Sequence, residues 1–315
     1  MMGAVQSVLD PAGPQARTIA EVTWWFFGLL TVVYVLVMGA LLWAVLRRRR
    51  DSDDAPETSR RLTTVVASAV GVTIATLVVL SVVSVVAGRG LTSPSGPGAI
   101  TIDVIGHQWW WEFQYHDVSA NERVNSPNEL HIPVGVPVAL KAMSRDVIHS
   151  FWVPNLHGKR DLIPGTVTHT WIQADRPGVY RGQCAEFCGH QHANMAFLVV
   201  AEPAEKFQQW LIQQRKGAPQ PKTDAQKRGH DIFMSGPCVM CHTIRGTPAG
   251  SRVGPDLTHV AGRLTLAAGT LPRTRGHLAG WIMDSQSIKP GNRMPPNALT
   301  GDDLQALLAY LETLR

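Results

Sequence analysis

The chain has 315 residues, of which 45% are hydrophobic and 17% are charged, and its formal net charge is +5. A basic balance can indicate nucleic-acid binding, but six of the arginines lie in one short segment and no nucleic-acid motif is present, so we expect no nucleic-acid partner. All four cysteines fall in two tight clusters, which is unlike the scattered spacing of a disulfide scaffold. The length allows more than one domain.

Two apolar runs near the N-terminus predict a transmembrane hairpin over residues 22–91, after an extracytoplasmic segment 1–21. The runs 22–46 and 62–87 contain no charged residue. At about 1.5 Å per residue, each is long enough to cross about 30 Å of hydrocarbon. A pair of buried strands is the alternative for the second run, but no proline interrupts it, and strands rarely exceed about ten residues.

The loop 47–61 between the two runs indicates how the hairpin is oriented. Cytoplasmic loops carry an excess of basic residues close to the helix ends. The arginines of this loop are Arg47, Arg48, Arg49, Arg50, Arg60 and Arg61. We therefore expect both termini and all that follows the hairpin to lie outside the cytoplasm. The first run is too long for a secretory signal and is expected to be retained.

The composition changes after the second run. A segment rich in Gly, Pro and Ser (88–98) marks the exit from the membrane. Short runs with β-branched residues and turn punctuation then predict a small β-sandwich over residues 99–201. A linker, 202–222, begins with an amphipathic helix expected over 203–215 and ends in a Pro-rich stretch. The last unit, 223–315, alternates short helical runs with Gly- and Pro-rich loops.

The first cysteine cluster, C-A-E-F-C-G-H-Q-H-A-N-M over residues 184–195, offers two thiolates, imidazoles and a thioether in one loop. Such soft ligands favour copper. A mononuclear blue-copper site needs one Cys, so Cys188, four residues after Cys184, indicates two sulfurs that bridge two copper ions. The second ion then requires another imidazole, and His149, which is expected to begin an upstream loop, is the best candidate.

Other interpretations of this cluster are a redox dithiol, a zinc site or a thioredoxin-like copper chaperone. In a chaperone the His lies downstream of the Cys pair, whereas His149 lies upstream, and a chaperone does not need Met195. His190 is expected to face solvent or to lie behind the ligands rather than to bind metal.

The loop, together with the upstream segment D-V-I-H-S-F-W-V-P (146–154), resembles the dinuclear CuA site of cytochrome c oxidase subunit II. In that family two His, two bridging Cys, a Met sulfur and a backbone carbonyl bind the copper ions. The resemblance assigns these roles to His149, His192, Cys184, Cys188, Met195 and the carbonyl of Glu186. It also implies that the Glu186 carboxylate reaches a magnesium ion at the interface with the catalytic subunit.

The second cluster, Cys238-Val-Met-Cys241-His242, is the C-x-x-C-H attachment site of c-type haem. Each thiol adds to a haem vinyl group, and the next residue, His242, places its imidazole under the iron. Alone, the pentapeptide also occurs in zinc and redox proteins. Its surroundings, from Q-K-R-G-H-D-I-F (226–233) through G-P-D-L to M-P-P, resemble a class I cytochrome c.

This second resemblance implies further roles in the last unit. The sixth iron ligand in that family is a Met in a Met-Pro loop, here Met294, and His/Met ligation raises the potential. The carbonyl of Pro255 is expected to support His242, and Trp281 to pack near the haem edge. Haem of this type is attached outside the cytoplasm, which agrees with the orientation expected from the arginines.

The segment G-H-Q-W-W-W-E-F-Q-Y (106–115) places three consecutive Trp on one predicted short strand. Alternate side chains of a strand face opposite sides, so the three cannot all be core. The segment resembles the aromatic stretch of subunit II, in which the first Trp lies on the path by which electrons enter, and this role falls to Trp109. The family also places a Glu and then a Trp at the start of the second helix, at the mouth of a proton path. Here Glu57 has no such Trp, and a solvated loop carboxylate explains Glu57 at least as well.

Together these features predict a two-helix transmembrane hairpin, an all-β cupredoxin-like sandwich and an all-α class I cytochrome c domain. We expect a subunit of a haem-copper terminal oxidase. Electrons from cytochrome c or a cytochrome bc complex would enter its haem and pass through the copper pair to catalytic subunit I, which reduces oxygen and pumps protons, with subunit III as a further partner. The alternatives are the CuA subunit of a nitric-oxide reductase and a membrane-tethered copper chaperone or redox sensor. A quinol oxidase subunit II would lack the copper ligands.

Overall fold

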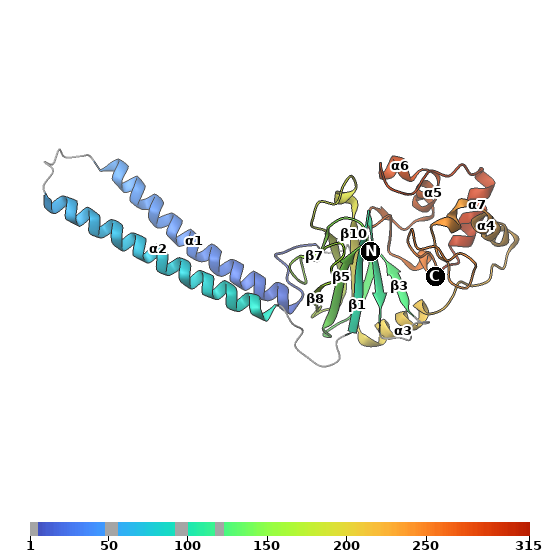
Figure 1. Cartoon of the computed structure of the whole chain (residues 1–315), viewed down its shortest axis with the longest axis horizontal. Helices are drawn as coiled ribbons and strands as arrows, with labels where there is room; N and C mark the ends of the chain where they lie inside the picture. Colours follow the sequence, from blue (N-terminus) through green and yellow to red (C-terminus); the bar gives the residue numbers. More distant parts are fainter. Residues whose placement is uncertain (1–5, 48–55, 92–99, 117–122) are drawn as a thin grey trace. The chain divides into compact units, whose positions relative to one another are not determined.

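The computed structural model divides into two units, Arg17–Thr92 and Met1–Ala16 with Ser93–Arg315, and each is described here by itself (Figure 1). The structure describes residues 6–47, 56–91, 100–116 and 123–315, with the backbone alone at 56–59. Arg48, Arg49, Arg50 and the side chain of Glu57 lie outside these described parts, as does most of the segment 88–98.

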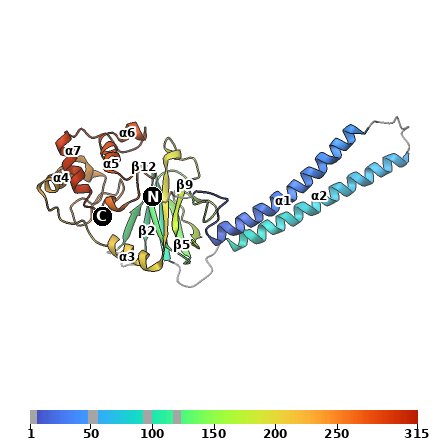
Figure 2. The same cartoon turned by 180° about the vertical axis from the view of Figure 1, so that it is seen from behind.

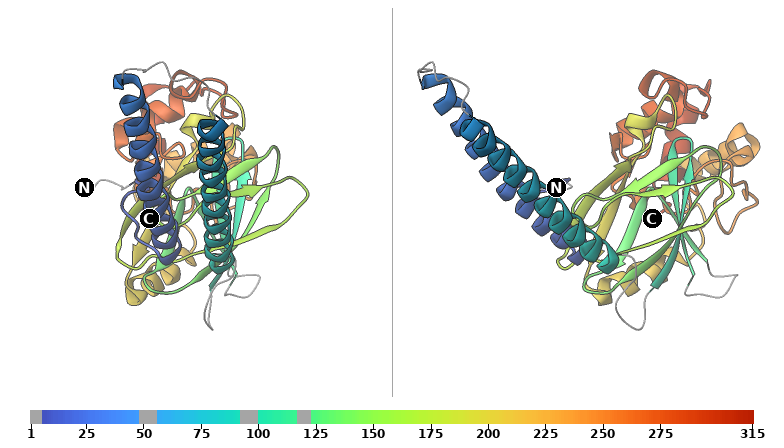
Figure 3. Two further views of the ribbon diagram at one scale, coloured as in Figure 1. Left: turned by 90° about the vertical axis from the view of Figure 1, so that its left-hand side faces the viewer. Right: turned by 60° about the vertical axis from the view of Figure 1, so that its left-hand side comes forward.

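The first unit consists of two long helices. α1 spans Pro14–Leu46 and α2 spans Pro56–Gly90, and they run antiparallel (Figure 3). Each begins with a proline, whose missing N–H is not needed in the first turn. By length and composition, Pro14–Leu46 and Arg60–Gly90 could each cross a membrane, with mean hydropathies of 2.6 and 2.5. Threonine and serine hydroxyls inside the apolar runs donate to carbonyls four residues earlier, which satisfies them locally.

The described residues between 100 and 202 form a β-sandwich of two five-stranded sheets. The first sheet has the order β3 (Val124–Pro127), β2 (Trp110–Tyr115), β1 (Ile100–His107), β5 (Val138–Ser144) and β8 (Thr168–Ile172). The second has the order β4 (Glu129–Pro133), β10 (Ala196–Glu202), β9 (Gly178–Cys184), β6 (His149–Trp152) and β7 (Arg160–Leu162). β1 pairs with β5 and β10 pairs with β4 in parallel, while the other neighbours are antiparallel.

An aromatic cluster fills the space between the two sheets. Trp111 and Phe113 of β2 face Phe151 of β6 and Phe197 of β10, with ring centroids 4.8–6.5 Å apart. All four side chains are at most 2% exposed. Because every second residue of a strand faces the core, this cluster fixes which side chains of the same strands point outward. Helix α3 (Ala204–Gln214) adds Phe207 and Leu211 to the same core.

The remaining residues form a helical domain with its own core (Figure 2). Its helices are α4 (Asp224–Ser235), α5 (Arg275–Met283), α6 (Ser285–Ile288) and α7 (Gly301–Leu311), with the 3-10 turn η3 (Pro237–Met240), the 3-10 turn η4 (Val260–Gly262) and a hairpin of β11 (Thr265–Leu266) and β12 (Leu271–Pro272). Thr223 and Gln226 form a capping box at the start of α4. Gly229 lets α4 approach α7, because a Cβ there would lie 2.0 Å from the Ala306 carbonyl oxygen.

Candidate metal centres

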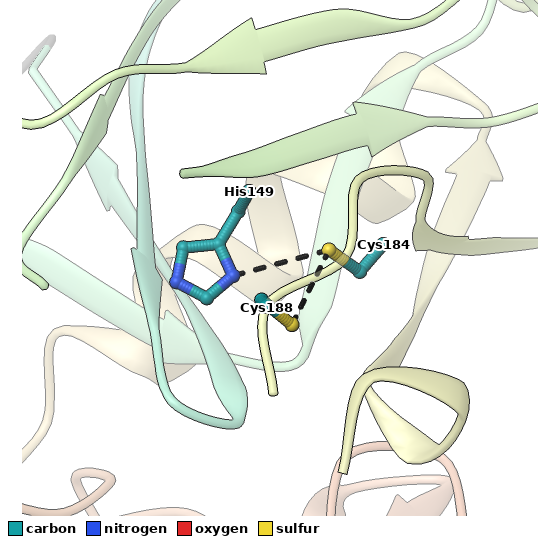
Figure 4. Close-up of side chains that lie close together, drawn as sticks. All are labelled: His149, Cys184 and Cys188. Carbon is teal, nitrogen blue, oxygen red and sulfur yellow. Dashed lines mark hydrogen bonds between the residues drawn. The ribbon is translucent and has the colours of Figure 1, made fainter. Parts of the chain in front are cut away.

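The residues that the sequence predicts as copper ligands meet where three strands end. Cys184 ends β9, and its N–H donates to the carbonyl of Met195, just before β10, at 2.9 Å, which closes the loop between them. The sequence predicts that His149 begins a loop, whereas it is the first residue of β6. Phe151 of β6 pairs with Cys184, so the imidazole of His149 lies beside the cysteines (Figure 4).

Each cysteine sulfur faces one imidazole. Cys184 Sγ lies 3.9 Å from His149 Nδ1, and Cys188 Sγ lies 3.6 Å from His192 Nδ1. The two sulfurs are 3.8 Å apart. The donor atoms of His149, Cys184 and Cys188 all lie within 4.8 Å of one another, and the three residues are buried.

Two further donors surround these four. Met195 Sδ lies 3.8 Å from Cys188 Sγ, and the carbonyl oxygen of Glu186 lies 3.2 Å from Cys184 Sγ. Thiolates and a thioether are soft ligands that suit copper, and imidazole also binds copper well. Two adjacent sulfurs, each with its own imidazole, suit two metal ions better than one. The residues therefore fit a copper pair.

The two thiols do not ionise independently. A hydrogen bond with Cys188 lowers the pKa of Cys184 to about 3, and His149 adds to this effect against the cost of burial. The same hydrogen bond, together with burial, raises the pKa of Cys188. The hydrogen bond between the sulfurs therefore favours a state in which one thiol is ionised and the other keeps its proton. Since metal ions bind thiolates, binding of copper would release that proton.

Asp146 holds the imidazole of His149 from the side away from the sulfurs. His149 Nε2 lies 2.8 Å from Asp146 Oδ1, and a carboxylate accepts, so Nε2 carries the hydrogen and Nδ1 is left for a metal. Burial alone would lower the pKa of His149, but Asp146 and Cys184 outweigh it and raise the pKa. Gly106 leaves room for this ring, because a Cβ there would lie 2.7 Å from His149 Cδ2. Sequence reasoning missed Asp146, although an acidic residue three positions before the His is a readable signal.

Two other polar side chains of this loop point to solvent. The Glu186 carboxylate is 44% exposed and lies 3.6 Å from the Lys159 ammonium, so only the carbonyl of Glu186 faces the sulfurs. His190 is exposed, as expected. An ion pair of this kind between exposed side chains contributes at most about 1 kcal/mol. It would therefore not prevent the Glu186 carboxylate from binding another cation.

The residues predicted to hold haem line one cavity of about 270 Å³. The lining includes all the residues of the helical domain that the sequence predicts to lie around the haem, namely Cys238, Cys241, His242, Pro255, Trp281 and Met294. The cavity is also lined by apolar side chains, among them Leu278 and Ile282 of α5. Two thiols, an imidazole and a thioether around an apolar space suit a covalently attached haem with His and Met as axial ligands.

His242 is oriented for an axial role by its backbone partner. Its Nδ1 lies 2.8 Å from the carbonyl oxygen of Pro255, which can only accept, so Nδ1 carries the hydrogen and Nε2 is free. Burial lowers the pKa of His242, which keeps the imidazole neutral, as an iron ligand must be. The Met294 carbonyl accepts hydrogen bonds from Ser285 and Gln286, which fix the loop that carries the thioether.

The three consecutive tryptophans have three different environments. Trp111 is fully buried and its ring lies against His149 at 6.2 Å between centroids. Trp110, the first residue of β2, stacks on His107 at 4.2 Å. Trp109 lies in the turn before β2, not on the strand, and its Nε1 donates to the Cys188 carbonyl at 2.9 Å. Trp109 and Trp110 also line the cavity of the helical domain.

The fold and the two sites define a class of protein, in which two candidate membrane helices precede a cupredoxin-like sandwich and a cytochrome c domain in the sequence. Two family comparisons agree with this class. The family described as cytochrome c oxidase subunit II, periplasmic domain, matches residues 119–202, and the family described as cytochrome c matches residues 226–315.

Individual relatives extend the match to nearly the whole chain. The chain is 33% identical over 317 residues to cytochrome c oxidase subunit 2 of Alkalihalophilus pseudofirmus, with 98% of this chain and 91% of the relative covered. It therefore belongs to the cytochrome c oxidase subunit 2 family and is a component of an oxidoreductase complex. Cytochrome c oxidase subunit 2 of Bacillus sp. strain PS3 is 32% identical over 69% of this chain and 62% of its own length. A crystal structure of the periplasmic domain of subunit II of cytochrome oxidase from Bradyrhizobium japonicum is 30% identical, covers 38% of this chain and 96% of its own, and has a TM-score of 0.36.

Proposed function

We propose that this subunit accepts electrons at a haem in its helical domain and passes them, through a copper pair in its sandwich, to a catalytic subunit that reduces oxygen. The haem would be attached to Cys238 and Cys241, with His242 and Met294 as axial ligands. The observation that carries the proposal is the pair of cysteine sulfurs 3.8 Å apart with one imidazole facing each. Copper and haem would supply one-electron redox chemistry, and the chain would supply their ligands and their spacing.

The protein contributes orientation and insulation to both sites. Asp146 and the Pro255 carbonyl each hold one ring nitrogen of a His, so the other nitrogen is presented to the metal. Burial of the sulfurs and of Trp111 keeps water from the copper ligands. Trp109 donates to the carbonyl of Cys188 and lines the cavity proposed to hold haem, which supports a role for its ring on the path of electrons.

The surroundings of the copper ligands support a protein partner. Ile148, next to His149, is 44% exposed, and Phe187, between the two cysteines, is 76% exposed. Exposed apolar residues beside a functional loop suit a surface covered by another subunit. We propose that the catalytic subunit covers them, that subunit III joins the same complex, and that the Glu186 carboxylate shares a magnesium ion there.

The proposed location is the plasma membrane of a bacterium, with both termini and both metal domains outside the cytoplasm. The electron donor would be a cytochrome c or a cytochrome bc complex. The arginine-rich loop, of which Arg47, Arg60 and Arg61 lie in the described residues, and the two apolar helices support this orientation.

Spectroscopy of the purified full chain tests the proposal most directly. We expect covalent low-spin haem, two copper ions per chain and a seven-line hyperfine pattern from one electron shared by both ions. Replacement of Cys188 by Ser should leave the haem spectrum unchanged and remove the seven-line pattern. Zinc in place of copper, or a four-line signal from a single copper in the unaltered chain, would contradict the proposal.

Co-purification tests the catalytic partner separately. A polytopic partner that carries two further haems and a copper ion is expected. A partner with haem and non-haem iron would indicate a nitric-oxide reductase instead. Isolation without any partner would favour a chaperone or redox sensor.

A further inference from the structure

Lys289 is a buried lysine between the sandwich and the helical domain. It follows α6 of the helical domain, and the residue is only 2% exposed. Its Nζ lies 2.8 Å from the Asn194 carbonyl oxygen, 3.1 Å from that of Ala267 and 3.5 Å from that of Trp109. Asn194 and Trp109 belong to the sandwich, and Ala267 belongs to the helical domain. Lysine is almost never buried this fully unless its ammonium is paired.

The two segments of the sandwich that Lys289 contacts are those of the proposed electron path. Asn194 directly precedes Met195 in the copper loop, and Trp109 precedes β2. One ammonium therefore joins the copper loop, the tryptophan turn and the helical domain. Burial lowers the pKa of Lys289 to about 8, so the amine is mostly protonated at neutral pH.

The turn that supplies the Ala267 carbonyl has an uncommon backbone conformation. Ala267 and Ala268 both have positive φ values, 53° and 57°, a conformation that is uncommon for residues with a Cβ. The strained turn presents one carbonyl to Lys289 and the next, that of Ala268, to the backbone N–H of Ala196 at 3.0 Å. Such strain persists only where the surrounding contacts determine it.

Two other side-chain hydrogen bonds join the sandwich and the helical domain near Lys289. Gln191 Nε2 donates to the Pro290 carbonyl at 2.7 Å, and Arg293 donates to the Gln108 amide oxygen at 2.6 Å. Arg293 is 62% exposed at its side chain, so water competes for its bond. Lys289 is the buried charged donor among these three, and hydrogen bonds from charged donors are the stronger kind.

We propose that Lys289 is a positioning residue that holds the helical domain against the copper loop and thereby fixes the distance over which electrons pass between haem and copper. The docking itself needs no metal, whereas its effect on electron transfer rests on the proposed function. The two parts of the inference can therefore fail separately.

Hydrogen exchange of the full chain, combined with photoreduction of the haem, tests both parts. Lys289→Met removes the charge and all three hydrogen bonds but keeps an unbranched side chain of similar length. Lys227→Met, an exposed lysine of α4, is the matched control. The reporters are backbone N–H groups that bond across the interface: that of Ala196, and those of Leu264 and Thr265, which donate to the Glu129 carboxylate at 2.5 and 3.2 Å.

We expect Lys289→Met to accelerate exchange at these N–H groups by about tenfold, with exchange in α7 and the covalent haem spectrum unchanged. Electron transfer from haem to copper should slow, while Lys227→Met should match the unaltered chain in both measurements. Unchanged exchange at the three reporters, or an equal rise in α7, would overturn the role of Lys289. If exchange rises but electron transfer keeps its rate, the docking is right and the proposed electron path is wrong. Lys289→Gln, which is uncharged and shorter, is judged by the same outcomes if the methionine variant does not accumulate with haem.

Discussion

The copper site and the haem site are built in different ways, although both use a pair of cysteines. The copper ligands are already in contact with one another at the ends of β6, β9 and β10, beside an aromatic core that is complete without metal. The haem ligands instead line a cavity of about 270 Å³ that short helices and loops of the helical domain form together with the tryptophan turn of the sandwich. The sandwich therefore holds a site that it does not need for folding. The helical domain has a buried core of its own, but the cavity lies beside it, and we expect the domain to depend on the group that fills the cavity.

The largest expected effect follows from loss of the haem attachment. In a chain with Cys238→Ala and Cys241→Ala the cavity would stay empty. At about 24 cal/mol per Å³, the value for enclosed cavities, this costs at most about 6 kcal/mol, which is comparable to the whole stability of a small domain. We expect no covalent haem and a loss of hydrogen-exchange protection in α4 and α7. Haem staining after denaturing electrophoresis and exchange measurements check this.

The matched change in the copper site should have a much smaller effect on folding. Cys184→Ser and Cys188→Ser together should abolish copper binding and leave the melting temperature of the sandwich within a few degrees, because serine nearly fills the same space. If this pair unfolds the sandwich, or if the helical domain keeps its protection without haem, the contrast between the two sites is wrong.

A second test concerns the close crossing of α4 and α7. Gly229→Ala would place a methyl group 2.0 Å from the Ala306 carbonyl oxygen and 2.9 Å from Tyr310 Cβ. The helices must separate, which we expect to destabilise the helical domain by about 3 kcal/mol. Gly276→Ala in α5, where nothing lies within 4 Å, is the control and should stabilise the domain slightly. Denaturant unfolding followed by the haem absorption measures both, and equal values for the two variants would contradict the close crossing.

The fold class could be predicted because its signals are local in the sequence. Two uncharged apolar runs, alternating β-branched runs and the C-x-x-C-H motif each lie within one segment, and the predicted fold class is confirmed. Short strands are harder to predict from sequence. β3 contains Asn, Ser and Pro, and β7 has three residues, so their pairing comes from neighbours rather than from propensity.

The predicted ligand sets are brought together by the structure, but their supporting residues depend on contacts between distant segments. Lys289 reaches Trp109 across 180 positions of the chain, and Glu129 reaches Leu264 across 135. Neither residue belongs to a motif. A lysine in a polar loop is most often a solvated side chain, so only tertiary structure distinguishes a buried one.

The next prediction separates metal binding from folding in the sandwich. The two Asp146 oxygens accept from His149 Nε2 and from the N–H groups of Gln108 and Val147. In Asp146→Asn the negative charge is lost and one oxygen becomes an amide NH₂, so at least one of these donors loses its acceptor and His149 is held less firmly. We expect copper affinity to fall by about 10- to 100-fold, as for other changes behind a metal-bound His. Competition with a copper chelator measures it.

Asp231→Asn is the control for this change, because its carboxylate is exposed on α4 in the helical domain. It should leave copper affinity unchanged. If Asp146→Asn also binds copper as tightly as the unaltered chain, Asp146 has no part in holding the ligand.

The smallest expected effect is a pH dependence confined to the sandwich. His131 of β4 stacks on Trp210 at 4.0 Å, and its Nδ1 lies 2.9 Å from the Glu202 carboxylate. Burial alone would lower the pKa of His131, but Glu129 and Glu202 outweigh it and raise the pKa above 6.5. The protonated form is thus favoured in the folded state. Its stabilisation is fully present below pH 6.5 and is lost as the pH rises through the raised pKa.

We therefore expect the melting temperature of the sandwich to fall by about 4–8 °C as the pH rises from below 6.5 through this range, for a loss of about 1 kcal/mol. In His131→Gln, which cannot be protonated, this part of the decrease should disappear. Calorimetry of the full chain at several pH values measures it, with the transition of the helical domain as an internal reference. A sandwich transition that instead rises with pH in the unaltered chain, or that keeps its slope in His131→Gln, would show that His131 is neutral in its ion-pair cluster.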